Sequence, residues 1–258
     1  MPRGQVPGSD MKAFVHGNPE TADIWKPLVA ELKLHGVDDV VLLTPPGFGA
    51  RPPKGWEATP SAYIDWLAGQ LEELGGNVDL VGHDWGAGHT FGLAATRPDL
   101  LRSYAADCGG LLHPDYVWHD AAQGWQTPDL GEQMMDGMLD AGADGLTAAY
   151  QGFGLSEDIA RPMAEAFNGD MAHCILTLYR AATQPHLQLL GDRLAGAEKR
   201  PALLIVPTED PYVPAEMAMP VAERLGARTL QLEGLGHWWM VESPERAARG
   251  LLDFWTVA

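Results

Sequence analysis

The stretch LVGHDWGAG, residues 80–88, decides the fold of this chain of 258 residues. An apolar, strand-like run leads into Asp84, and glycines stand two positions before and two positions after it. Glycines at these places allow a strand to turn sharply into a helix while the two backbones lie close together. The stretch therefore predicts a strand, a tight turn that exposes Asp84, and a helix. The simpler alternative is that the Asp84 side chain only caps the helix.

Strand-like and helix-like segments alternate on both sides of this turn. The alternation favours an α/β fold, with a mostly parallel sheet and helices on both of its faces. Helical spacing of apolar residues predicts helices at 21–36, 61–76 and 243–255. The strand-like segments are 13–17, 37–49, 78–82, 101–110, 201–211 and 228–239. We expect the segment 37–49 to be a buried strand.

A long segment without strand patterns interrupts the alternation. It is rich in Met, Trp and Gly, shows helical periodicity, and is too long for an ordinary loop. We interpret it as a helical cap over the carboxyl ends of the strands, where ligands bind in open α/β sheets. The predicted domains are therefore residues 1–112 for the first part of the core, 113–199 for the helical cap, and 200–258 for the second part of the core.

The composition of the chain limits the classes of molecule that the protein is expected to bind. The chain has 17 Lys and Arg against 35 Asp and Glu, a formal net charge of −18, which disfavours nucleic acid and anionic membranes as partners.

Cys108 and Cys174 lack metal-ligand spacing and the histidines are scattered, so we expect no metal and no organic cofactor. The first ten residues lack the apolar core of a signal peptide and no later run could span a bilayer, so we expect a cytoplasmic protein. The sequence indicates no oligomeric state.

Two further residues stand in the order that a nucleophile–acid–base site requires. His237 follows a strand-like segment and a glycine-rich loop, and Asp210 ends a buried strand in a loop bounded by prolines. A turn nucleophile, then an acid, then a histidine is the chain order of one large class of hydrolases. Asp210 would then orient His237. Glu209 and Asp107 are the alternatives for the acid.

Together these motifs resemble the α/β-hydrolase superfamily over residues 12–110 and 200–258. The resemblance is closest to its Asp-nucleophile branch, the epoxide hydrolases and haloalkane dehalogenases. The motifs that carry it are His16-Gly17-Asn18-Pro19, Gly82-His83-Asp84-Trp85-Gly86, Asp210 and Gly236-His237-Trp238. One departure is that only about eleven residues precede the segment 13–17, so we expect the first strands of the family fold to be missing or minimal.

An aspartate at the turn implies a particular chemistry. A serine suits attack on a carbonyl, whereas a carboxylate suits displacement at a saturated carbon and gives an alkyl-enzyme ester. The ordinary pKa of an aspartate, roughly 4, leaves Asp84 ionised at neutral pH without the help of a base. In this interpretation His237 activates the water that hydrolyses the ester, and the backbone N–H groups of Trp85 and Asn18 stabilise the oxyanion.

The leaving group divides the two families that the chain resembles. Epoxide hydrolases protonate the leaving oxygen with tyrosines of the cap, and Tyr179-Arg180 resembles their Tyr-Arg pair. Tyr150 is our first choice for the second tyrosine and Tyr116 the alternative. Haloalkane dehalogenases bind the halide with N–H donors, and Asn18 with Trp85 resembles that pair. We expect an epoxide hydrolase that forms a diol, with a haloalkane dehalogenase as the alternative and a non-catalytic hydrolase-fold binding protein as the alternative of another class.

Apolar residues of the predicted cap allow two interpretations. They line a pocket for the substrate, or they form the core of the cap itself. These residues are Trp118, Trp125, Met134, Met135, Met138 and Phe153. The first interpretation predicts that the partners of the site are a small hydrophobic organic substrate and water.

Overall fold

The computed structural model describes residues 11–258, and within them one sheet has six strands, all parallel, in the order β2-β1-β3-β4-β5-β6. The strands are β1 (Lys12–Val15), β2 (Val40–Leu43), β3 (Val78–Gly82), β4 (Leu101–Ala106), β5 (Ala202–Pro207) and β6 (Arg228–Leu232). The predicted α/β class with a parallel sheet is confirmed. The strands that the family fold has before β1 would fall in residues 1–10, outside the described residues.

The strand β2 corrects one expectation. Its segment was expected to be buried, but three of its four residues are only partly buried. The reason is its place in the sheet: β2 is an edge strand and pairs with β1 alone. A run of apolar residues does not reveal whether a strand lies at the centre or at the edge of a sheet.

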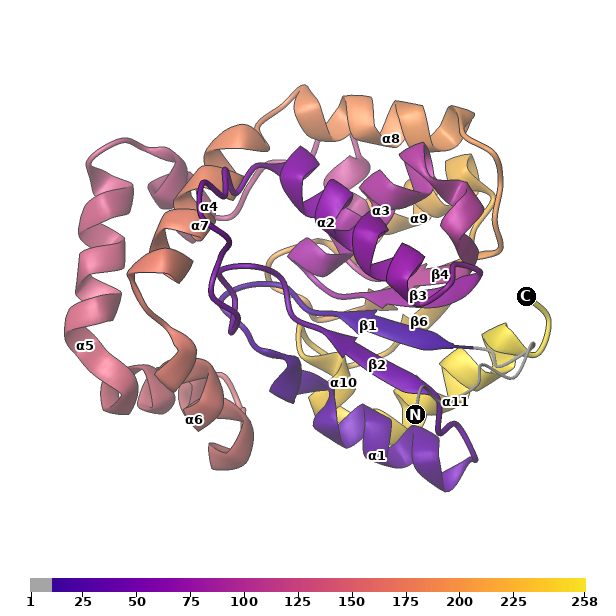
Figure 1. Cartoon of the computed structure of the whole chain (residues 1–258), viewed down its shortest axis with the longest axis horizontal. Helices are drawn as coiled ribbons and strands as arrows, with labels where there is room; N and C mark the ends of the chain where they lie inside the picture. The colour runs from indigo at the N-terminus through magenta and orange to yellow at the C-terminus, as the bar shows by residue number, and fades with distance from the viewer. Residues whose placement is uncertain (1–10) are drawn as a thin grey trace.

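Helices cover both faces of the sheet (Figure 1). One face carries α1 and α11, which contact each other, and the other carries α2, α3, α8 and α9 in a continuous layer. The bounds are α1 (Lys26–Leu34), α2 (Pro60–Glu73), α3 (Trp85–Thr96), α8 (His186–Gly196), α9 (Ala215–Leu225), α10 (Trp239–Glu242) and α11 (Pro244–Trp255). Short 3-10 turns are η1 (Ala22–Trp25), η2 (Pro98–Leu100) and η3 (Gly109–Leu112).

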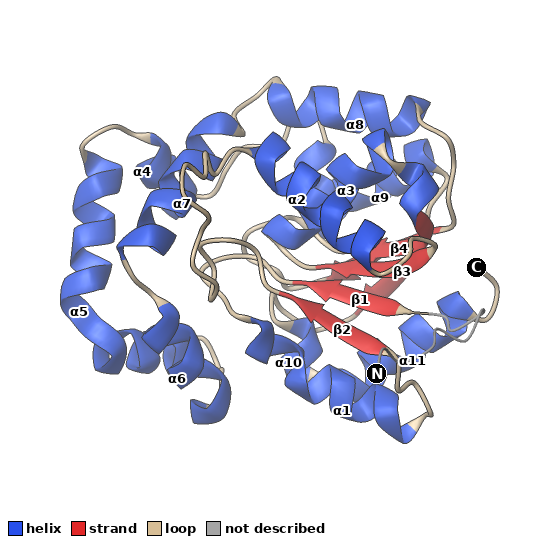
Figure 2. Ribbon diagram, viewed as in Figure 1, coloured by secondary structure: helices blue, strands red, loops and turns tan. Residues whose placement is uncertain are grey.

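Four helices stand away from the sheet, beyond the carboxyl ends of the strands (Figure 2). They are α4 (Asp120–Gln126), α5 (Leu130–Gly152), α6 (Glu157–Ala166) and α7 (Gly169–Ala181), and they contact mainly one another. The next helix, α8, packs instead against α3 and α9 over the sheet. Helices α4–α7 therefore form a separate group within the insert, beyond the carboxyl ends of the strands.

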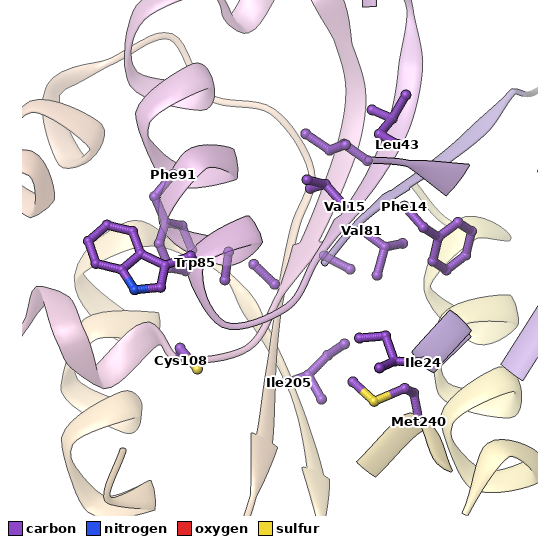
Figure 3. Packing of buried hydrophobic residues seen from close by; sticks show 14 of the residues in the cluster. Phe14, Val15, Ile24, Leu43, Val81, Trp85, Phe91, Cys108, Ile205 and Met240 are labelled. Atoms are coloured by element: carbon purple, nitrogen blue, oxygen red, sulfur yellow. The ribbon is translucent and has the colours of Figure 1, made fainter. Parts of the chain in front are cut away.

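Apolar side chains fill the space between the sheet and its helices (Figure 3). Val15 and Val81 of the central strands lie between Phe91 of α3 and Ile24 of η1, and all four are buried. This packing fixes the distance between α3 and the sheet. It therefore also fixes the position of the turn at the start of α3. Among residues 11–258, no helix is long and apolar enough to cross a membrane.

The helix α5 is kinked at Gly142, where φ is 61° and ψ is −177°. Only glycine adopts this conformation readily, so Gly142→Ala is expected to lower the free energy of unfolding by about 1–3 kcal/mol. Gly137 in the same helix has helical backbone angles and open space around it. Gly137→Ala is therefore expected to raise the free energy of unfolding by up to about 1 kcal/mol.

Urea unfolding of the two variants measures both effects. A Gly142→Ala protein as stable as the wild type would contradict the kinked conformation.

Candidate active site

The register of the central strands brings the residues of the candidate site together. Val15 at the end of β1 pairs with Gly82 at the end of β3, and Gly82 pairs with Ala106 at the end of β4. Residues that follow these three strands must therefore meet at one edge of the sheet. They are the loop 16–20, the turn 83–85 and Asp107.

The turn has the strained conformation that its sequence predicts. Asp84 has φ 52° and ψ −120°, which residues with a side chain rarely adopt. A Cβ atom at Gly86 would lie 2.2 Å from the carbonyl oxygen of Val15, and one at Gly17 would lie 2.1 Å from Oδ1 of Asp84. The two glycines therefore allow β1, its loop and the turn to touch.

The acid and the histidine meet at this turn. The Nδ1 atom of His237 lies 2.9 Å from Oδ2 of Asp210, and its Nε2 atom lies 3.9 Å from Oδ2 of Asp84. Asp210 is held in turn by the backbone N–H groups of Tyr212 and Val213, both donating to Oδ1. Of the three candidates for the acid, Asp210 is the one beside His237; Glu209 is exposed, and Asp107 bonds elsewhere.

The charges of these three groups depend on one another. Burial alone would lower the pKa of His237, but the Asp210 carboxylate outweighs it, and the pKa of His237 is raised. Burial would raise the pKa of Asp210, but His237 and its hydrogen bond outweigh it, and that pKa is lowered. Burial raises the pKa of Asp84 to about 6, so Asp84 is mostly ionised at pH 7.

The two oxygens of Asp84 have different surroundings. Oδ1 accepts a hydrogen bond of 2.9 Å from the backbone N–H of Asn18, whereas Oδ2 faces His237. The separation of 3.9 Å from Nε2 is too long for a hydrogen bond. Oδ2 is thus the oxygen free to react, and Oδ1 occupies the place of an oxyanion.

A second charged network, which the sequence did not reveal, lies beneath the first. The ring of His83 is fully buried between two carboxylates, with Nδ1 bonded to Asp107 and Nε2 lying 3.1 Å from Glu20. Burial alone would lower the pKa of His83, but the two carboxylates raise it well above its ordinary value. We therefore treat His83 as a buried imidazolium.

This network ties the loops of the site together. Asp107 accepts the backbone N–H of Asp84 at 2.9 Å, so it holds the strained turn directly. Glu20 accepts the backbone N–H of Gly17 at 3.1 Å and the indole N–H of Trp238 at 2.6 Å. The loop after β1, the turn and the loop of His237 are thereby joined through one buried cation.

The predicted tyrosines fall into two groups. Tyr179 is buried, and the centroid of its ring lies 5.2 Å from the ring centroid of Trp85. Burial first, and then the charge of Asp84, raises the pKa of Tyr179; burial, then Cys108, and then Asp84 raise the pKa of Tyr116. The hydroxyls of Tyr116 and Tyr150 both donate to backbone carbonyls, of Tyr212 and Pro19 respectively. The pKa of Tyr150 is raised by burial and by the charge of Glu20 rather than that of Asp84.

Two buried N–H donors near Asp84 have no hydrogen-bond partner among the described residues. They are Nδ2 of Asn18 and Nε1 of Trp85. Unpaired buried donors are uncommon in proteins, and a water, an ion or a ligand can accept the bond. The side chain of Arg180, next to Tyr179, is by contrast bonded to Glu132 at 2.7 and 2.8 Å.

Donor atoms that could hold a metal ion occur in two groups of three within the described residues. One group is Glu20, His83 and His237, and the other is Cys108, Asp210 and His237. In each group the carboxylate already lies within hydrogen-bond distance of an imidazole nitrogen.

A cavity of about 560 Å³ opens beside Asp84. Its wall near the turn is formed by Asp84, Trp85 and Trp118. Of the apolar residues predicted to line the pocket, Trp118 does so, whereas Phe153 is 61% exposed on the surface. Asp84 therefore borders a space large enough for a small organic molecule.

The network beneath the site makes a prediction about stability. Glu20→Gln removes one of the two carboxylates that compensate His83, so the free energy of unfolding at pH 7 should fall by about 3 kcal/mol. The pKa of Glu20 is lowered from 4.5 to about 2, mainly by His83 acting against burial. A group with a lowered pKa stabilises the fold above its unfolded pKa, so the difference should be complete above pH 4.5 and shrink as the pH falls towards 2.

Urea unfolding of Glu20→Gln at several pH values measures this difference. The exposed Glu57→Gln is the matched control and should change the stability by less than about 0.5 kcal/mol. Equal effects of the two substitutions would show that His83 is not a compensated cation.

Comparisons with known proteins identify relatives of this chain. The chain is 28% identical over 244 residues to an (E)-2-((N-methylformamido)methylene)succinate hydrolase of Acinetobacter baylyi, covering 92% of this chain and 87% of the relative. A haloalkane dehalogenase of Bradyrhizobium diazoefficiens is 32% identical over 111 residues, which cover 42% of this chain and 34% of that protein.

Solved structures show the same fold. A haloalkane dehalogenase loop variant from Bradyrhizobium elkanii superposes with a TM-score of 0.74 at 22% identity, covering 97% of this chain and 92% of that one. The model of the "Alpha/beta hydrolase family" matches residues 13–249, which include all the strands from β3 to β6 and every member of the site. The chain therefore belongs to the α/β hydrolase family.

Proposed function

We propose that this α/β hydrolase is an epoxide hydrolase with Asp84 as nucleophile, Asp210 and His237 as acid and base, and helices α4–α7 as its cap. The nucleophile supports the choice of reaction. The Asp84 carboxylate is mostly ionised at neutral pH, its residue lines a cavity, and its oxygen Oδ2 lies 3.9 Å from Nε2 of His237, too far for a hydrogen bond. A carboxylate in this state displaces a leaving group from a saturated carbon.

The proposed reaction has two steps. First, Oδ2 of Asp84 attacks an epoxide carbon, the carbon–oxygen bond breaks, and the ring oxygen takes a proton from Tyr179. Second, His237 takes a proton from water, and the resulting hydroxide attacks the ester carbonyl, whose oxygen Oδ1 is stabilised by the N–H of Asn18. The diol leaves with the attacking oxygen of Asp84, the proton on His237 returns through solvent to the tyrosinate, and the sum is epoxide plus water to diol.

Tyr179 is the observation that carries the choice of an epoxide. The departing oxygen of an epoxide is an alkoxide and needs a proton, whereas a halide needs none. Burial holds the pKa of Tyr179 well above its ordinary value, so the hydroxyl keeps its proton until the alkoxide forms. Tyr116 is the proposed second tyrosine, and its hydroxyl is anchored on the carbonyl of Tyr212 at 3.1 Å.

A haloalkane dehalogenase is the second candidate, and one observation favours it. The unpaired N–H donors of Asn18 and Trp85 are suited to a halide ion, which accepts hydrogen bonds and needs no proton. Two of the relatives described above are haloalkane dehalogenases by name. The two candidates share the alkyl-enzyme ester and differ in the leaving group.

The relative from Acinetobacter baylyi is named for another substrate, a succinate that carries an N-methylformamidomethylene group. Amide hydrolysis is attack on a carbonyl, for which an aspartate nucleophile is poorly suited. A succinate also carries two carboxylates, and the wall of the cavity near Asp84 is formed by tryptophans. We therefore do not transfer that substrate to this chain.

The ester itself provides the test. His237→Gln removes the base of the second step but not the nucleophile, so the ester should accumulate. Intact-protein mass spectrometry after incubation with styrene oxide should show an adduct with the mass of the whole epoxide, and Asp84→Asn in the same background should abolish it. An adduct from bromobutane instead, with bromide released, would favour the dehalogenase. Absence of any adduct would contradict both candidates.

Tyrosine variants in the same background separate the two leaving groups. Tyr179→Phe removes the proposed proton donor, so the rate of adduct formation from the epoxide should fall by a factor of about 100 or more. Tyr150→Phe is the matched control, because its hydroxyl bonds Pro19, and it should leave that rate nearly unchanged. An unchanged rate in Tyr179→Phe would contradict the role of Tyr179.

A further inference from the structure

The cavity beside Asp84 continues far beyond the reacting groups. Asp84 precedes α3 and Arg97 follows it, yet both residues line the same cavity. The helix between them has 12 residues, which corresponds to about 18 Å along its axis. The cavity is thus a groove that runs the length of α3, with α2 on one side and α8 on the other.

The groove has apolar walls and little side-chain bulk on two of its three sides. Ile64 and Ala68 of α2 face Leu187 and Leu190 of α8 across it. Where α2 borders the groove, a Cβ atom at Gly69 would meet nothing within 4 Å. Charged residues line the groove as well: Asp65 of α2 and Arg193 of α8, and, at the end away from Asp84, Glu72 and Arg97, which are bonded to each other.

We propose that this groove holds the chain of an extended, unbranched, mainly apolar substrate whose reacting carbon lies at Asp84. The proposal rests on the proposed function for the identity of the reacting carbon. Three observations carry it: the groove reaches Asp84, it is long and bounded by three helices, and apolar side chains of α2 and α8 line it. A side chain added at Gly69 would find open space beside this lining, so we expect this position to limit the length of chain that the enzyme accepts.

A pair of substrates and a pair of variants test this inference. The substrates are the terminal epoxides epoxybutane and epoxydecane, which differ only in the length of the unbranched chain. Gly69→Phe places a ring in the groove, and loss of contact with about two methylene groups should lower kcat/KM for epoxydecane roughly tenfold. The value for epoxybutane, which ends before Gly69, should stay unchanged. Gly137→Phe, at an exposed helical glycine with open space outside the groove, is the matched control and should change neither value.

Binding of an unreactive alcohol separates this inference from the proposed function. Calorimetry should show that decanol binds the wild type and Gly137→Phe, and that Gly69→Phe binds it roughly tenfold more weakly. If neither epoxides nor bromoalkanes react but this binding pattern holds, the groove inference stands and the proposed function fails. Decanol that does not bind the wild type, binding that Gly69→Phe leaves intact, or equal losses of kcat/KM for both epoxides would overturn the groove inference.

Discussion

Asp84 is held in a backbone conformation that costs free energy, and the rest of the site is arranged so that it cannot relax. The hydrogen bond from its N–H to Asp107 holds the backbone of the turn, and the close packing of Gly86 against β1 holds the start of α3. Residues in such conformations persist only where their surroundings determine them completely. The parallel register of β1, β3 and β4 supplies those surroundings, because it delivers the three loops to one edge.

The charges around this turn are balanced in two tiers. Asp84, His237 and Asp210 form the upper tier, where one histidine lies between two carboxylates and near the cavity. His83 lies between Glu20 and Asp107 in the lower tier, away from solvent. The ring centroids of the two histidines lie 4.6 Å apart, so the charge of each tier acts on the other. The upper tier is suited to chemistry, and the lower tier keeps the loops in place.

The sequence predicted those parts of the molecule that depend on local pattern. Alternating segments predicted the parallel sheet, and the glycines around Asp84 predicted the turn. Spacing could not choose among Asp210, Glu209 and Asp107, because all three follow strands; only the approach of His237 distinguishes them. The network of His83 could not be predicted from the sequence, because Glu20 and His83 are 63 residues apart and only the register of β1 and β3 brings them together.

The helical insert was the least predictable part for a related reason. Periodicity indicates which face of a helix is apolar but not what that face will meet. Tyr150 lies in α5 and Tyr116 in the loop before α4, yet both hydroxyls are bonded to backbone carbonyls of loops of the core, those of Pro19 and Tyr212. Likewise, nothing in the pattern of α8 indicates that it leaves the insert, packs along α3 and forms one wall of the groove.

The central claim is that Asp84 forms an ester with the substrate, and one isotope experiment tests it directly. A single turnover in water enriched in oxygen-18, with enzyme in excess over an epoxide, is followed by mass analysis of the diol and of the peptide that contains Asp84. An ester hydrolysed at its carbonyl gives a diol without oxygen-18 and labels the Asp84 carboxylate. A labelled diol and an unlabelled Asp84 peptide would show that water attacks the substrate directly, which contradicts the account.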